Sequence, residues 1–427
     1  MPLPLIDDEA GLRAVDAKSA SPGSADAKRT VMLLASLPRQ LKEYYLYSAV
    51  YWSLPSLTRC CLEAKCSADT RDEDGDPILV MAAGNGDVRV IKVLLDGGAH
   101  HGLQNRYGFT AICGAAEGGH LEAVRLLLAA GADANLGSVF GTTPLMKAIS
   151  QKHTECARAL LPVSDLLRTN IQGFQPIHVC ILTGNEECFE LLLPLIGDVD
   201  VRTLPGVDEH GKAKITFNTT PLHLACQAGL QPMVKALLQR GASRMARDNE
   251  QTTPLHFAAD AGHLSCVILL IGRKGREKMT PAEVSAVDTD GISALHAAAH
   301  HGFEKIVGVL LQAGARLDLK DVLGDTPLML ARKAHPTNTP LLALLSGAAP
   351  AHLPGTVCDH CGKSAEQAGV EFLKSCGACY GMRYCGAGCS AAAWPGHKEA
   401  CKEARAERER RTTTRTVAAP PLQAPRQ

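Results

Sequence analysis

The 427-residue sequence has few aromatic residues and no excess of charge of either sign. Phe, Trp and Tyr make up 4% of the residues, whereas hydrophobic residues make up 46%. A core of Ala, Leu, Val and Gly with few aromatic rings fits closely packed helices better than an all-β sandwich. The 44 basic and 44 acidic side chains cancel, so the chain has no global electrostatic attraction to nucleic acid or to an anionic membrane.

Long apolar runs are also absent from the sequence. No stretch of 18 apolar residues occurs, which argues against a membrane-spanning helix. The first ten residues lack the basic and then apolar layout of a secretory signal. We therefore expect the chain to fold in the reducing cytoplasm, which we favour, or in the nucleus. In either compartment its 16 cysteines are expected to be thiols or metal ligands rather than disulfides.

An internal repeat fills the middle of the chain. Segments such as Thr-Pro-Leu-His recur in one register, mostly at intervals of 32 or 33 residues with two longer intervals of 45 and 40. The residues in the Pro slot are Ile78, Ala111, Pro144, Pro176, Pro221, Pro254, Ala294 and Pro327. In six of the eight copies a Gly follows eight positions after this slot, and a Leu-rich stretch comes next. Eight copies in one register indicate a repeat architecture.

Each repeat unit encodes two short helices. Thr or Ser before Pro supplies an N-cap oxygen, and Pro is well suited to the first helical position because it has no N–H to leave unpaired. The later Gly allows a left-handed helix end, and the Leu-rich stretch forms the second helix. The unit resembles the ankyrin repeat over residues 40–347, with a degenerate first copy at residues 46–70. The resemblance implies an all-α solenoid of helix-turn-helix units joined by hairpin loops.

The histidines and most cysteines of the repeats are expected to be structural. His178, His223, His256 and His296 share a slot that is occupied by Val80, Cys113, Met146 and Met329 in the other copies. A slot that accepts Val and Met packs against neighbours, and its His is expected to bond loop backbone. The nine cysteines between Cys60 and Cys266 are expected to behave as small hydrophobes. The long intervals mark insertions near 202–217 and 273–288, either neutral loops or parts of a binding face.

A second pattern begins after a small-residue linker at residues 348–357. Eight potential Cys and His ligands lie within 44 positions, spaced Cys-x2-Cys, Cys-x2-Cys, Cys-x3-Cys and His-x3-Cys: Cys358, Cys361, Cys376, Cys379, Cys385, Cys389, His397 and Cys401. A ninth residue, His360, lies between the first two cysteines and is not expected to be a ligand. Thiolate and imidazole groups are the ligands that Zn²⁺ prefers in tetrahedral sites, and eight ligands suffice for two ions. Closed sites of this kind are structural rather than catalytic, and zinc would supply most of the stability of so short a segment.

Residues 358–401 also resemble the MYND-type zinc finger. Tyr384-Cys385 and the run Trp394-Pro395-Gly396-His397-Lys398 match that family beyond the ligands. The resemblance implies interleaved sites, with Cys358, Cys361, Cys385 and Cys389 on one zinc ion and Cys376, Cys379, His397 and Cys401 on the other. It also implies a groove for Pro-rich peptides that includes Trp394, unless that ring only packs over a zinc knuckle. One position departs from the family, because Ser390 replaces the usual Gln of the groove.

The ends of the chain have a different composition from the repeats. Residues 1–39 contain many Ala, Ser and Asp residues and are expected to be disordered. Residues 402–427 begin with alternating charges, which favour a solvated helix, and then turn Thr- and Pro-rich, which favours disorder.

Together these features predict a non-enzymatic adaptor whose repeats and zinc finger each bind proteins, since no catalytic motif occurs. Expected contact residues at the repeat tips are Arg106, Tyr107, Phe140, Arg247 and Asn249. The main alternative is a transcriptional or chromatin co-regulator that recruits a corepressor through the finger. The neutral charge argues against direct contact with nucleic acid. Activity as a ubiquitin-ligase substrate receptor is a further, weaker alternative.

Overall fold

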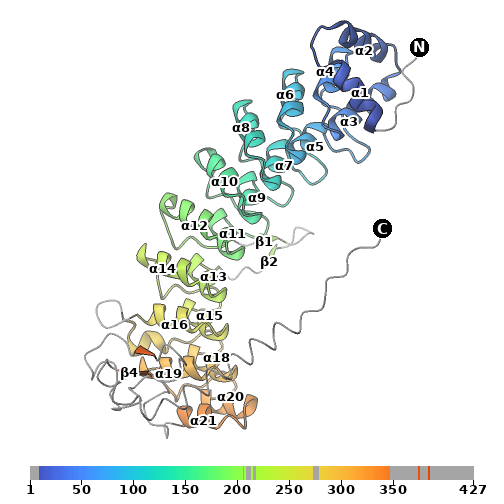
Figure 1. The fold of residues 1–427 in the computed structure, drawn as a ribbon. Coiled ribbons are helices and arrows are strands. Elements are labelled where there is room, and N and C mark those ends of the chain that lie inside the picture. Colours follow the sequence, from blue (N-terminus) through green and yellow to red (C-terminus); the bar gives the residue numbers. More distant parts are fainter. Residues whose placement is uncertain are drawn as a thin grey trace, which may run out of the picture. The chain divides into compact units, whose positions relative to one another are not determined.

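The computed structural model describes residues 9–204, 206–207, 213–214, 218–272, 278–346, 374–375 and 383–384. The chain divides into two units, Met1–Ala294 and Leu295–Gln427. In the first unit short helices stack in successive antiparallel pairs, and each hairpin connection precedes the next pair (Figure 1). The predicted all-α repeat fold is confirmed.

Each repeat contributes a first helix that begins at the Pro slot and a second helix that follows the left-handed turn. The first helices are α5 (Ile78–Asn85), α7 (Ala111–Gly118), α9 (Pro144–Ser150), α11 (Pro176–Leu182), α13 (Pro221–Gln227), α15 (Pro254–Asp260), α18 (Ala294–His300) and α20 (Pro327–Ala334). The second helices are α6 (Val88–Asp96), α8 (Leu121–Ala129), α10 (Thr154–Leu160), α12 (Glu186–Leu192), α14 (Gln231–Gln239), α16 (Leu264–Ile271), α19 (Glu304–Gln312) and α21 (Thr339–Leu345). Short 3₁₀ turns, η1 (Leu161–Val163) and η2 (Leu193–Leu195), extend α10 and α12.

The N-terminal segment corrects one prediction, because residues 9–39 are helical rather than disordered. Helices α1 (Glu9–Lys18) and α2 (Ala25–Ala35) precede α3 (Arg39–Tyr51) and α4 (Pro55–Glu63). The side chains of Leu12 and Leu34 are 2% and 0% exposed, and Asp16 accepts a hydrogen bond from the Leu57 N–H at 2.8 Å. A repeat stack needs a cover for the apolar face of its first unit. The apolar positions of α1 and α2 supply it, although they follow no repeat period.

The two insertions lie between repeats. The first carries a two-residue antiparallel ladder, β1 (Gly206–Val207) with β2 (Ala213–Lys214), in which Gly206 faces Lys214. Its base is closed by Thr203, whose N–H donates to the Thr219 carbonyl at 2.9 Å. The second insertion contains α17 (Pro281–Val284), where Thr280 and Glu283 cap each other's backbone N–H. A second short ladder, β3 (Lys374–Ser375) with β4 (Arg383–Tyr384), lies in the zinc-finger segment.

The shared histidines bond loop backbone, as predicted, and the loop belongs to the following repeat. In His223, Nδ1 accepts the Thr220 N–H at 3.2 Å, so Nε2 carries the proton and donates to the Thr252 carbonyl at 3.1 Å. His178 and His256 make the same pair of bonds to their own helix cap and to the following hairpin. His296 donates to the Asp325 carbonyl at 3.3 Å. The last repeat has Met329 in this slot.

The cysteines of the described residues are packing residues rather than site residues. All nine are free thiols and eight are buried, Cys66 being half-buried. Burial raises the pKa of the Cys113, Cys180 and Cys226 thiols. The described residues contain no group of three or more Cys, His, Asp or Glu side chains arranged to hold a metal ion. The burial of the eight cysteines agrees with the expectation that they fill the core.

Two repeats lack Gly in the left-handed slot. The last has His335, which is not left-handed at φ −135°, whereas the other keeps the left-handed backbone with Lys152, and we expect that position to be a point of weakness. Lys152 occupies this slot at φ +62°, whereas Gly119 and Gly229 adopt φ +75° and +69° in theirs. A residue with a Cβ is strained there by about 1 kcal/mol. Replacing Lys152 with Gly should therefore raise the free energy of unfolding by about 0.5 kcal/mol, after the entropy cost of Gly in the unfolded chain. Urea titration of the variant checks this, and an unchanged or lower midpoint would contradict it.

Candidate protein-interaction surface

The hairpin tips between repeats are held by one recurring polar side chain. Six positions before the Pro slot, an Asp, Asn or Ser accepts two backbone N–H groups across the turn. Asn105, for example, accepts the N–H groups of Tyr107 and Phe109 at 3.0 and 2.9 Å. The same bonds are made by Asp72, Ser138, Asn170, Asp248, Asp288 and Asp321. This polar side chain fixes the turn without using the side chains of the tip residues, and it was not predicted from the sequence.

Neighbouring tips are connected through their backbones. The Val139 N–H donates to the Tyr107 carbonyl at 3.0 Å, and the Ile171 N–H donates to the Phe140 carbonyl at 2.9 Å. The Leu204 N–H continues the series with a 3.0 Å bond to the Gly173 carbonyl. Because these bonds join three successive tips to the hairpin that follows each, the tips between residues 105 and 174 form a rigid row rather than independent loops. A rigid row loses little conformational entropy when it binds a partner.

Apolar side chains are exposed on this row. Tyr107, Val139 and Phe140 are 46%, 60% and 45% exposed. In the second unit, Val322 and Leu323 occupy a tip and are 70% and 82% exposed. Large exposed side chains on a rigid scaffold are typical of interaction surfaces. Tyr107 and Phe140 were predicted from the sequence. Val139 was not, although the repeat register alone places it beside Phe140.

The other predicted tip residues differ in their surroundings. Arg106 is exposed and pairs with Asp74 of the preceding tip at 3.2 Å, and the negative charge of Asp74 raises the Arg106 pKa. Asn249 is exposed. Arg247 is half-buried, and its guanidinium donates to the Val287 carbonyl of the next hairpin at 3.4 Å. Arg247 thus serves the fold, and its contact with a partner stays a prediction.

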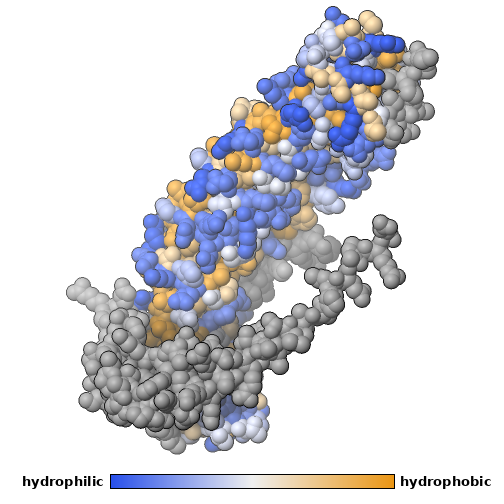
Figure 2. Space-filling model, in the orientation of Figure 1, coloured by the Kyte–Doolittle hydropathy of each residue, from blue (hydrophilic) through white to orange (hydrophobic). Residues whose placement is uncertain are grey.

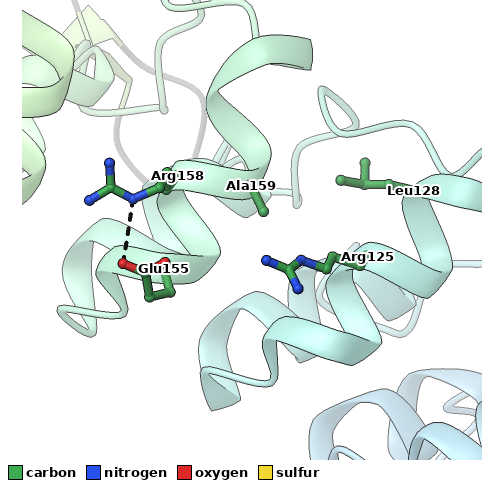
Figure 3. A pocket seen from close by; sticks show the side chains of 5 residues that line it. All are labelled: Arg125, Leu128, Glu155, Arg158 and Ala159. Carbon is green, nitrogen blue, oxygen red and sulfur yellow. Dashed lines mark hydrogen bonds and ion pairs between the residues drawn. The ribbon is translucent and has the colours of Figure 1, made fainter.

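The outer surface carries a shallow hollow between the second helices α8 and α10. Its volume is about 390 Å³, and it is lined by Arg125, Leu128, Glu155, Arg158 and Ala159 (Figure 3). Arg125 pairs with Glu122 at 2.9 Å and Arg158 pairs with Glu155 at 3.4 Å, all four being more than half exposed. Pairs within one helix leave little unbalanced charge for a ligand. On the face shown in Figure 2, hydrophilic residues lie along the stack between smaller hydrophobic patches.

Family comparisons agree with the repeat geometry. A model of three ankyrin repeats matches residues 46–138, 115–203 and 201–282, and a single-repeat model matches residues 290–322. These matches cover more than half of the chain. The chain belongs to the ankyrin-repeat family. Its ankyrin stack is therefore a protein-interaction module, as that family typically is.

Individual relatives share the ankyrin segment and not their whole length. The mouse B-cell lymphoma 3 protein homolog is 30% identical over 184 residues, which are 42% of this chain and 38% of that protein. Human inversin is 28% identical over 156 residues, or 36% of this chain and 13% of inversin. The crystal structure of the Bcl-3 ankyrin repeat domain has a TM-score of 0.40 and 27% identity, covering 64% of this chain and all of that domain.

The zinc-finger segment matches the MYND finger family over residues 358–401. This family implies zinc binding, and its members, like ankyrin repeats, are typically interaction modules rather than enzymes. All eight predicted ligands and Trp394 lie outside the described residues. Of this segment the structure describes β3 and β4, with Ser375 facing Arg383. Among the described residues no helix is long and apolar enough to cross a membrane.

Proposed function

We propose that the protein is a non-enzymatic adaptor that binds one partner on the ankyrin hairpin tips and a second on the MYND finger. The observation that carries this proposal is the rigid row of tips with exposed apolar side chains. The backbones of Tyr107, Val139 and Phe140 join neighbouring tips, and the Tyr107 ring lies 5.3 Å from the Arg106 guanidinium. Their side chains nevertheless remain 46%, 60% and 45% exposed, which supports their use as contacts for a partner. Two sites on one chain raise the effective concentration of one partner near the other.

The finger is proposed to hold two structural zinc ions with the family's interleaved pairing. Cys376 follows the last residue of β3, and Cys385 follows the last residue of β4. Because the strands are antiparallel, they end at opposite ends of the ladder. This arrangement supports assigning Cys376 and Cys385 to different ions. A Pro-rich peptide remains the proposed ligand of the finger, with Trp394 in its groove.

The zinc proposal predicts how many zinc ions each chain holds and predicts that loss of one ion unfolds the finger. Atomic emission on the purified chain should give two zinc ions per molecule. Cys385→Ser is expected to release one ion and to unfold residues 358–401, because metal binding contributes most of the folding free energy of such modules, about 10 kcal/mol or more. Protease mapping with and without chelator reports the unfolding. A content of one ion, or an intact segment after chelation, would contradict the proposal.

The tip proposal is tested by a paired substitution with a matched control. Tyr107→Ser with Phe140→Ser removes two exposed rings and should lower partner affinity at least about tenfold, since buried aromatic contacts dominate interfaces. Val163→Ser with Leu195→Ser removes apolar side chains that are 51% and 57% exposed on the 3₁₀ turns, away from the tips, and should change nothing.

Affinity capture with mass spectrometry compares four proteins: wild type, the tip variant, the control variant and Cys385→Ser. The adaptor proposal predicts that one set of partners is lost with the tip variant and a different set with Cys385→Ser. If the tip variant retains every partner of the wild type, the tips are not the binding surface. If Cys385→Ser retains every partner, the finger contributes no second site.

A further inference from the structure

A hollow of about 610 Å³ lies at the N-terminal end of the row of tips. One wall is a single face of α3, because Gln40, Glu43, Tyr44 and Tyr47 follow at helical spacing. The other wall is the first hairpin, residues 71–74. The hollow therefore lies between a helix face that carries two tyrosine rings and a tip that carries carboxylates.

The charge of the hollow is negative. Four carboxylates, those of Glu43, Asp72, Glu73 and Asp74, line it together with one cation, Arg71. The Arg71 guanidinium is already used, since it donates to the carbonyls of Gly75 and Gln104 at 2.6 and 3.1 Å.

The carboxylates of the hollow differ in the hydrogen bonds and ion pairs that they already make. Asp72 caps two N–H groups of its own turn, while Glu43 pairs with Arg39 at 2.7 Å and Asp74 with Arg106 at 3.2 Å. The Asp74 carboxylate is 66% exposed and that of Glu43 is 31% exposed. Ion pairs that solvent can reach contribute little to stability, so both carboxylates can accept a new cation. Glu73 makes no hydrogen bond or ion pair with the described residues.

The tyrosines add a second preference for a cation. Tyr44 is 41% exposed, and Tyr47 stacks on Tyr51 with ring centroids 5.9 Å apart. Burial raises the Tyr47 pKa, and the negative charges of Asp72, Glu73 and Asp74 raise it further. The ring therefore lies in a negative field. Aromatic faces beside carboxylates attract guanidinium and ammonium groups through both cation–π and ionic contacts.

We propose that this hollow binds an arginine or lysine side chain from a basic segment of a partner protein. The hollow borders the first tip, and Arg106 connects that tip to the next through its ion pair with Asp74. A partner that extends along the row of tips would thus place its basic segment here and its apolar residues over Tyr107 and Phe140. The inference rests on the proposed use of the tips and names the chemistry of the partner.

The probe for the test is a fluorescein-labelled pentapeptide with three central arginines, compared with its alanine and glutamate counterparts. Fluorescence anisotropy with the zinc-loaded full chain should show binding of the arginine peptide alone, weaker at high salt. Glu73→Gln with Asp74→Asn should raise the Kd at least about fivefold. Glu250→Gln with Asp290→Asn, at the tips of later hairpins, is the matched control and should leave the Kd within about twofold.

Two substitutions of Tyr47 distinguish a specific cation site from a general attraction to surface charge. Tyr47→Phe keeps the ring face and should retain binding, whereas Tyr47→Leu should weaken it about threefold or more. Equal binding of the arginine and alanine peptides would overturn the proposal. An unchanged Kd in the variant with Glu73→Gln and Asp74→Asn would overturn it as well. A peptide of residues 402–416 that binds here at least about tenfold more tightly than the probe would assign the hollow to the chain's own tail instead.

Failure of the hollow and failure of the tips are distinguishable. The tip variant with Tyr107→Ser and Phe140→Ser leaves the hollow intact. Suppose that the tip variant loses its captured partners and that the arginine peptide binds neither the wild type nor any variant. The adaptor function then stands, and only the binding of a basic segment in the hollow is excluded.

Discussion

Acidification from pH 7 to pH 5 is expected to destabilise the first unit by about 2 kcal/mol for each of three buried histidines. Burial lowers the pKa of His178, His223 and His256 to about 4, from an ordinary value of 6.5. Protonation would place the ring's second proton on Nδ1. This nitrogen carries no proton in the neutral ring, because it accepts the N–H of the helix cap.

The sign follows from the proton balance. Between pH 6.5 and pH 4 the unfolded chain binds protons at these imidazoles and the folded chain does not. The stabilisation is therefore complete above about pH 6.5 and is lost as the pH falls toward 4.

Urea unfolding followed by far-ultraviolet circular dichroism at pH 7.5, 6.5 and 5.0 measures the effect, since most of the helix signal comes from the repeats. His223→Met is the informative variant because the same slot holds buried Met146 in another repeat. We expect it to be less stable than wild type at pH 7.5, through the lost hydrogen bonds. The decrease in its free energy of unfolding between pH 6.5 and pH 5.0 should be smaller than that of the wild type by the contribution of one histidine. An unchanged pH dependence in this variant would contradict the assignment.

Gly173→Ala is expected to destabilise the chain by about 3 kcal/mol or more. Gly173 adopts φ +79°, and a Cβ there would lie 1.8 Å from the Leu204 carbonyl oxygen. The two backbones cannot separate easily, because the Gly173 carbonyl accepts the Leu204 N–H at 3.0 Å. The substitution therefore breaks the bond between one tip and the insertion at residues 202–217.

Gly75→Ala measures the backbone-strain part of this cost, so the difference between the two variants gives the steric part. Gly75 has a similar φ of +83°, but nothing lies within 4 Å of a Cβ placed there. Its substitution should cost about 1 kcal/mol through backbone strain alone. Thermal unfolding of both variants, side by side, gives the difference. Equal midpoints would show that the contact with Leu204 relaxes without cost.

The sequence predicted the repeats closely because each unit carries its own start and stop signals. Helices α9, α13 and α15 begin at the Pro slot as expected, and α5 and α7 begin at the same slot without Pro. Local chemistry of this kind acts within one repeat, so a single sequence is enough to read it. Helices α1 and α2 were missed because they follow no repeat and gain their order from packing over α4.

Contacts between neighbouring repeats were harder to predict. The exposure of Tyr107 and Phe140 followed from their place at the tips, but the bonds that join one tip to the next depend on the spacing of the stacked units. Arg247 shows the same difficulty. Its acceptor, Val287, lies across an insertion that lengthens the repeat interval to 40 residues, and no local pattern connects the two. The zinc-ligand assignment remains a prediction.

The burial of the repeat cysteines has a practical consequence for chemical labelling. Because burial keeps the Cys113, Cys180 and Cys226 thiols protonated and covered, maleimide and iodoacetamide should not modify them in the native stack. Cys66 differs, since a hydrogen bond from Cys61 lowers its pKa and its Sγ lies 3.7 Å from the Lys42 carbonyl on α3. A fluorophore attached to this native thiol would sit close to the helix that carries Tyr44 and Tyr47.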